Sequence, residues 1–203
     1  MKTKLILTLI TSLFVCALQA AESPSVGAAA PDFSLSDPKG KTHSLTQYKG
    51  KYVVLEWFNP ECPFVKKHYG PGNMQKLQEE FASKGVVWLS IDSSAPGLEG
   101  HLTPEQANKT IADWKMNSTT VLFDPDGKTG QAYGAKNTPH MFVISPEGKV
   151  IYQGAIDSKA TPKSEDIAGS TNYVKVALDE AIGGKPVSNA STKPYGCSVK
   201  YKK

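Results

Sequence analysis

The segment Tyr52-Val-Val-Leu-Glu-Trp-Phe58 is a nearly continuous run of β-branched, aliphatic and aromatic residues. Such runs are typical of strands that are buried on both faces, as in a parallel sheet covered by helices. Asn59-Pro-Glu-Cys-Pro63 follows at once, and proline suits the first turn of a helix, where its missing N–H would have no partner. We therefore expect a central strand that turns directly into a helix at Cys62.

The rest of the chain alternates strand-like and helix-like segments. This order predicts an α/β fold in which a central mixed β-sheet, part parallel and part antiparallel, is flanked by helices. An N-terminal β-hairpin is expected over residues 33–45, around the turn at residues 37–40. Thr103-Pro-Glu-Gln106 has the form of a helix capping box. Further strands are expected at residues 86–91, 119–123, 141–145 and 150–153, and helices from residue 63, at 73–83, from 103, near 128–133 and at 171–182.

Residues 1–20 differ in composition from the rest. Lys2 and Lys4 precede an apolar run over residues 5–18, and Ala20 is a small residue suited to cleavage. This pattern predicts a secretory signal peptide, because the apolar run is shorter than the about 20 residues of a membrane span. We expect a periplasmic or secreted protein with no stable membrane insertion after cleavage. The alternatives are an uncleaved anchor and a lipid attached to Cys16.

The mature chain divides into one domain, residues 21–183, and a polar, lysine-rich tail, residues 184–203, that carries Cys197. The tail contains glycine and proline, which predicts a mobile segment able to fold back onto the domain. Lys2 and Lys4 are the only charged residues of the leader, so its removal lowers the formal net charge from +4 to +2. So small a charge excludes a nucleic-acid partner.

Loss of the leader would also remove Cys16 and leave two cysteines, Cys62 and Cys197. Two thiols in an oxidising compartment can pair, which allows at most one intramolecular disulfide and excludes a metal cluster made of cysteines alone. At the start of a helix, unpaired N–H groups and the helix dipole favour a thiolate. Lys66 and His68, within the first two turns, would add positive potential. Cys62 is therefore the predicted nucleophile, and a structural cysteine without turnover is the alternative.

A family resemblance rests on four segments. Ala30-Pro-Asp-Phe33, residues 48–55, the turn at Cys62 and Thr138-Pro139 resemble the alkyl hydroperoxide reductase/thiol-specific antioxidant (redoxin) branch of the thioredoxin superfamily, over residues 25–183. Cys62-Pro-Phe-Val-Lys and Tyr195-Gly-Cys-Ser-Val-Lys200 resemble a peroxiredoxin-like subgroup.

The resemblance implies a thioredoxin-like fold in which a cis-proline lies beside the active cysteine. Pro139 would be that proline, and Thr138 would present backbone groups to the substrate. His140, which follows it, would tune the thiolate of Cys62. The implied substrate groove consists of Asn59, Pro60, Thr138 and Pro139. No metal and no cofactor is implied.

The chain departs from two family patterns. The peroxiredoxin threonine and proline positions hold Asn59 and Leu55, and all 23 basic residues are lysines, so the peroxiredoxin arginine is missing. A lysine lacks the planar fork of the guanidinium group. The Cys-x-x-Cys pair of thioredoxins is missing too, because Asn59 and Val65 occupy the possible second positions. Cys197 is then the predicted resolving thiol; a static disulfide and an unpaired tail thiol are the alternatives.

The function predicted from these features is that of an exported thiol-dependent oxidoreductase or antioxidant protein. Its substrate would be a peroxide or a protein disulfide, and a dithiol protein would reduce it. The missing threonine and arginine favour disulfide exchange, whereas the missing Cys-x-x-Cys disfavours it. The alternative is a non-catalytic thioredoxin-fold module with a structural Cys62–Cys197 disulfide, for binding or for copper handling with His68 and His140.

Overall fold

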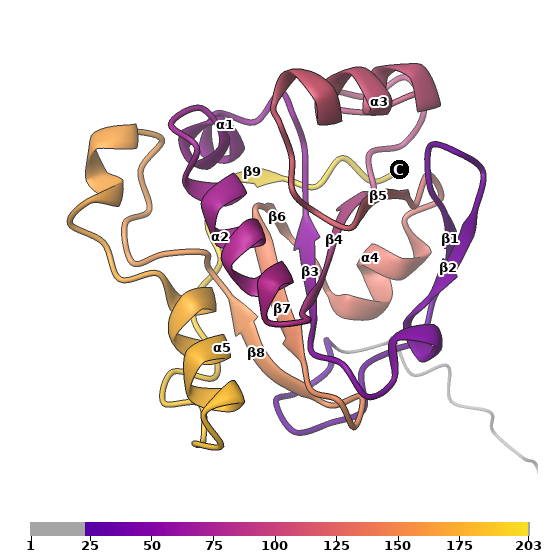
Figure 1. The fold of residues 1–203 in the computed structure, drawn as a ribbon. Helices are drawn as coiled ribbons and strands as arrows, with labels where there is room; N and C mark the ends of the chain where they lie inside the picture. Colours follow the sequence, from indigo (N-terminus) through magenta and orange to yellow (C-terminus); the bar gives the residue numbers. More distant parts are fainter. Residues whose placement is uncertain (1–22, 203) are drawn as a thin grey trace, which may run out of the picture.

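A seven-stranded mixed sheet lies at the centre of the molecule in the computed structural model, which describes residues 23–202 (Figure 1). Its strand order is β2-β1-β5-β4-β3-β7-β8. The central strand β3 (Val53–Trp57) pairs in parallel with β4 (Val87–Asp92) and antiparallel with β7 (His140–Ile144). The remaining strands of the sheet are β1 (Ser34–Ser36), β2 (Thr42–Ser44), β5 (Thr120–Phe123) and β8 (Val150–Gly154).

Helices cover both faces of the sheet, which confirms the expected thioredoxin-like α/β architecture. Along β3, Val54 faces one hydrophobic cluster, while Val53 and Leu55 face the other, as the two-residue repeat of a strand requires. The first cluster is completed by α1 (Pro63–Tyr69), α2 (Asn73–Ser83), α3 (Pro104–Asp113) and α5 (Tyr173–Ile182), and the second by α4 (Lys128–Tyr133).

Two local predictions are confirmed. β1 and β2 form the expected N-terminal hairpin, with Ser34 opposite Ser44. The capping box at the start of α3 is also present: the Gln106 N–H donates to Thr103 Oγ1 at 3.3 Å, and the Thr103 N–H donates to Gln106 Oε1 at 2.8 Å. The predicted signal peptide lies outside the described residues. Within residues 23–202, no helix is both long and apolar enough to cross a bilayer.

The described part of the tail folds back onto the domain, as its glycine and proline content allowed. The Gln153 N–H donates to the Ala190 carbonyl, and the Thr192 N–H donates to the Gln153 carbonyl. Further on, the tail forms β9 (Cys197–Ser198), which pairs antiparallel with β6 (Asn137–Thr138) in a separate two-stranded sheet. Backbone hydrogen bonds thus carry the tail along the edge of the domain, past the start of α1 (Figure 1).

Candidate active site

Cys62 is the N-cap residue of α1 and lies just beyond the end of β3. A turn leads into the helix, since the Cys62 N–H donates to the Asn59 carbonyl at 3.2 Å, and Pro63 occupies the first helical position. The strand-to-helix turn expected from the sequence is therefore present. The Cys62 side chain is fully buried.

Cys62 and Cys197 are brought together although 135 residues separate them. Their Sγ atoms lie 2.8 Å apart, and both are free thiols. A disulfide bond is about 2.05 Å long, so a small displacement separates this dithiol from a disulfide. The Cys62 thiol also donates to the Thr138 carbonyl at 3.1 Å.

The pKa values of the two thiols shift in opposite directions. Burial raises the pKa of Cys62, but hydrogen bonds with the Cys197 thiol, with Thr138 and with the N–H groups of Cys197 and Val65 outweigh it, so that this pKa is lowered overall. Burial, together with the neighbouring Cys62 sulfur, raises the pKa of Cys197 to about 12. The first thiolate of the pair therefore forms at Cys62, and Cys197 keeps its proton.

The peptide bond between Thr138 and Pro139 is cis, as the resemblance implied. This turn lies beside both sulfurs, because Thr138 accepts from Cys62 and is the partner of Cys197 in the β6–β9 pair. The contact is tight: a Cβ atom on Gly196 would lie 2.1 Å from the Thr138 carbonyl oxygen. Only glycine lets the tail approach this closely.

Asn59 lies near Cys62 but uses both ends of its amide within the loop. Its Oδ1 accepts from the Glu61 N–H at 2.8 Å, and its Nδ2 donates to the Glu99 carbonyl at 3.4 Å. The side chain is buried against Gly100, where a Cβ atom would lie 2.3 Å from it. Asn59 thus holds the loop through its Oδ1 and one of its two N–H groups, and its side chain is buried. Pro60, beside it, is half-buried.

The expected positive charge near the thiolate needs correction. Lys66 is exposed on α1. His68 and His140 are buried, and burial lowers the pKa of each to about 4, so both rings are neutral at neutral pH and add no charge. His140 Nδ1 accepts from the Lys136 N–H at 3.3 Å. The lowered pKa of Cys62 comes instead from its hydrogen bonds with Cys197, Thr138 and Val65.

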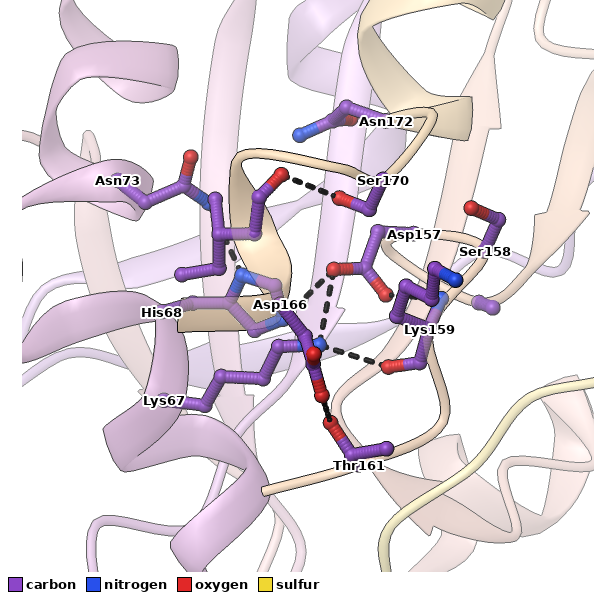
Figure 2. A network of polar contacts seen from close by, with 12 residues as sticks. Lys67, His68, Asn73, Asp157, Ser158, Lys159, Thr161, Asp166, Ser170 and Asn172 are labelled. Carbon is purple, nitrogen blue, oxygen red and sulfur yellow. Dashed lines mark hydrogen bonds and ion pairs between the residues drawn. The ribbon is translucent and has the colours of Figure 1, made fainter. Parts of the chain in front are cut away.

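A buried polar network beside α1 was not expected from the sequence (Figure 2). Lys67 Nζ forms an ion pair with Asp157 Oδ2 at 2.9 Å and donates to the Lys159 carbonyl at 2.7 Å. The side chains of Lys67 and Asp157 are at most 1% exposed. Tyr195, from the tail, donates its hydroxyl to the second oxygen of Asp157. No local pattern identifies the pair, because 90 residues separate Lys67 from Asp157.

Glu56 is a second buried charge that the sequence reasoning did not use. It lies in the middle of β3 and is fully buried, which raises its pKa to about 7. The carboxylate accepts from four side chains: Trp88 Nε1 at 2.8 Å, Tyr69 Oη at 3.0 Å, Ser90 Oγ at 3.2 Å and Gln78 Nε2 at 3.5 Å. The sequence signal that could have identified Glu56 is a single acidic residue inside an apolar run.

The copper-handling alternative gains no site from the geometry. Among residues 23–202, no group of three or more His, Cys, Asp or Glu side chains is arranged to hold a metal ion. The ring of His68 is committed to neighbours, with Nδ1 2.9 Å from Asn73 Nδ2 and Nε2 3.4 Å from the Tyr195 hydroxyl.

A cysteine at the start of the helix that follows the central strand, beside a cis-proline in a mixed sheet, defines the class of thioredoxin-like thiol proteins. The sequence model of the AhpC/TSA family matches residues 26–153. The chain belongs to this family.

Individual relatives agree with this assignment. The chain is 30% identical over 154 residues to the thiol-disulfide oxidoreductase ResA of Bacillus subtilis (strain 168), covering 74% of this chain and 80% of the relative. A hypothetical protein from Sinorhizobium meliloti 1021 shares the fold, with a TM-score of 0.77, 23% identity and coverage of 89% of this chain and 97% of that one. A putative thiol:disulfide interchange protein DsbE from Chlorobium tepidum is 29% identical, with a TM-score of 0.52 over 64% of this chain and 85% of that one.

Proposed function

We propose that this protein is an exported thiol–disulfide oxidoreductase in which Cys62 is the nucleophile and Cys197 is the resolving thiol. One observation carries the proposal: the two sulfurs lie 2.8 Å apart at the start of α1, and their pKa values are shifted in opposite directions. Similarity to the thiol-disulfide oxidoreductase ResA and to a putative thiol:disulfide interchange protein DsbE supports the same chemistry.

The opposite shifts give the two thiols different tasks. The Cys62 thiolate attacks one sulfur of a substrate disulfide, which forms a mixed disulfide and releases the first substrate thiolate. Cys197 then loses its proton and attacks Sγ of Cys62. This step forms the Cys62–Cys197 disulfide and releases the second substrate thiolate, so that two electrons have passed from the protein to the substrate.

The partners follow from this sequence of steps. The substrate is a disulfide in another protein, and a dithiol protein returns the Cys62–Cys197 disulfide to the reduced state. No cofactor is required. Disulfide exchange is preferred to peroxide reduction for two reasons. The Asn59 amide is hydrogen-bonded within its own loop, and the chain has no arginine to orient a peroxide.

The experiment uses residues 21–203 in glutathione buffers of graded redox ratio, with mass spectrometry as the readout. The proposal requires a Cys62–Cys197 disulfide in the wild type and a glutathione adduct on Cys62 in Cys197→Ser. It also requires catalysis of insulin reduction by dithiothreitol that Cys62→Ser abolishes. A parallel sample receives one equivalent of hydrogen peroxide.

Two results would contradict the proposal. Faster oxidation of Cys62 by peroxide than by glutathione disulfide would assign the protein to peroxide chemistry. A Cys62–Cys197 disulfide that forms once and is never exchanged would assign it to the non-catalytic class.

A further inference from the structure

The buried network of Lys67, Asp157 and Tyr195 ties the cysteine-bearing tail to the helix that begins beside the nucleophile. Tyr195 is two residues before Cys197 in the chain. Its hydroxyl donates to Asp157 Oδ1, while Asp157 Oδ2 holds Lys67 of α1 at 2.9 Å. In Figure 2, Asp157 lies between Lys67 and Lys159, enclosed by the loop that follows β8.

Tyr195 also packs directly on one face of α1. Its ring lies 5.8 Å from the ring of Phe64, centroid to centroid, and Lys67 Nζ lies 5.4 Å from its centroid. Its hydroxyl is 3.4 Å from His68 Nε2. Residues 64, 67 and 68 are spaced to lie on the same side of a helix. Tyr195 therefore holds the tail against α1 through its aromatic ring and its hydroxyl group.

These contacts form without a disulfide between the two cysteines. Both thiols are free here, and Tyr195 is nevertheless docked. Burial raises the pKa of Asp157, but the hydrogen bonds from Tyr195 and Lys67 outweigh it and lower this pKa overall, so the group is a carboxylate at neutral pH. A buried carboxylate that loses one of its donors is strongly destabilised. The network thus favours the docked tail in the dithiol state.

We propose that Tyr195 is a positioning residue. With the Lys67–Asp157 ion pair it forms a latch that keeps the tail docked in the dithiol state. The docked tail shields Cys62 from external disulfides and holds Cys197 ready to resolve a mixed disulfide. This inference rests on the proposed function. The latch acts on two steps in opposite directions. Cys62 is fully buried, so a substrate reaches its sulfur only after β9 separates from β6. Resolution needs the tail to return.

The balance of the second step is simple. The Cys62–S–S–R mixed disulfide and the Cys197 thiol give the Cys62–Cys197 disulfide and R–SH. No oxidant beyond the mixed disulfide is consumed. A weaker latch therefore speeds formation of the mixed disulfide and slows its resolution.

Tyr195→Phe tests the latch, because it keeps the ring on Phe64 and removes only the hydroxyl. A hydrogen bond to a charged group is worth enough for about a tenfold change in the ratio of undocked to docked tail. Tyr52→Phe is the matched control, since its hydroxyl donates to the Ala181 carbonyl at 2.9 Å, at the end of α5. Asp157→Asn is unsuitable, because it would leave Lys67 buried without its counter-charge.

The chromogenic disulfide dithiobis(nitrobenzoate) reports both steps in residues 21–203. In a Cys197→Ser background, Tyr195→Phe should speed the single release of nitrothiobenzoate from Cys62 by about tenfold. With both cysteines present, the second release, which Cys197 drives, should slow by about tenfold. Tyr52→Phe should change neither rate. Thermal unfolding of the reduced variants checks that each is folded.

Unchanged rates in Tyr195→Phe, or two rates that move in the same direction, would overturn the latch. Failure of the proposed function looks different. In that case the wild type gives no second release that depends on Cys197, while the single release in the Cys197→Ser background still measures whether Tyr195 covers Cys62.

Discussion

Cys62 and Cys197 are two cysteines in spatial contact whose pKa values nevertheless shift in opposite directions. Their sulfurs are in contact, but hydrogen-bond donors surround Cys62, whereas Cys197 lies against the negative charge of the Cys62 thiolate. Each thiol thereby sets the pKa of the other. The lowered pKa of Cys62 is a property of the docked tail as much as of the helix start, because the thiol and the N–H of Cys197 are among its donors.

Cys197→Ala should therefore raise the pKa of Cys62. The variant removes the thiol donor and introduces no other donor, whereas serine would still supply a hydroxyl. The ultraviolet absorbance of the thiolate, followed against pH in the reduced protein, measures the shift. Cys62→Ala is the control: Cys197 then titrates without the neighbouring Cys62 sulfur, which helps to raise its pKa to about 12, so this pKa should fall. An unchanged or lowered pKa in Cys197→Ala would contradict this account.

Glu56 should make folding stability depend on pH with a defined sign. Burial raises its pKa from 4.5 to about 7, so the folded protein binds a proton more tightly than the unfolded chain does. The contribution of this group to the free energy of unfolding is fully present below pH 4.5 and is lost as the pH rises through about 7, by about 3 kcal/mol in total.

Denaturant unfolding of the wild type and of Glu56→Gln at several pH values tests this prediction. The difference in unfolding free energy between the two should shift in favour of Glu56→Gln by about 3 kcal/mol from pH 4 to pH 8. Glu79→Gln, at an exposed position on α2, is the control and should show no comparable change. A difference that does not vary with pH would show that folding leaves the pKa of Glu56 unchanged.

The elements differ in how much of them the sequence could reveal. The apolar run of β3, the capping box of α3 and the turn of the β1–β2 hairpin are local patterns, and each is present as expected. β6 and β9 have two residues each and no periodicity, so their pairing was not foreseen. That pairing depends on the close approach of Gly196 to Thr138, which is a property of the folded chain.

Gly196→Ala should dislodge β9. The residue has a φ of +119°, and its new Cβ would overlap the Thr138 carbonyl oxygen. This strain should weaken the docking of β9 and expose Cys62. The rate of iodoacetamide reaction at Cys62 should therefore increase by about tenfold. Gly184→Ala is the matched control, since its φ is +72° and no atom lies within 4 Å of the added Cβ. Equal rates in the two variants would mean that the contact at Gly196 does not hold the tail.

At the scale of the whole molecule, the site is assembled from parts that sequence cannot connect. The choice between Lys66 and Lys67 depends on what covers α1: Lys67 faces Asp157 and the tail, and its neighbour faces solvent. Two adjacent lysines look alike until the covering segment is known. Cys62, Cys197 and Pro139 were identifiable in advance because their residue types and their order along the chain carry the chemistry.

Export is tested on the intact chain. Recovery from the periplasm of a bacterial host should give a protein that begins at Ala21, because Ala20 is the predicted cleavage position. Cys16→Ser should be exported equally well. A full-length protein retained with membranes would identify the leader as an anchor, and loss of membrane retention in Cys16→Ser would identify a lipid.

The separation of the two thiols by 135 residues also determines the order in which they are synthesised. A ribosome makes Cys62 long before it makes Cys197, so the nascent protein has a nucleophile without its intramolecular partner. The pair exists only after the segment that carries Cys197 has emerged and docked. Formation of the Cys62–Cys197 disulfide would then mark a chain that has been synthesised as far as Cys197, and a chain that had not yet reached Cys197 would be recognisable by the foreign thiols bound to Cys62.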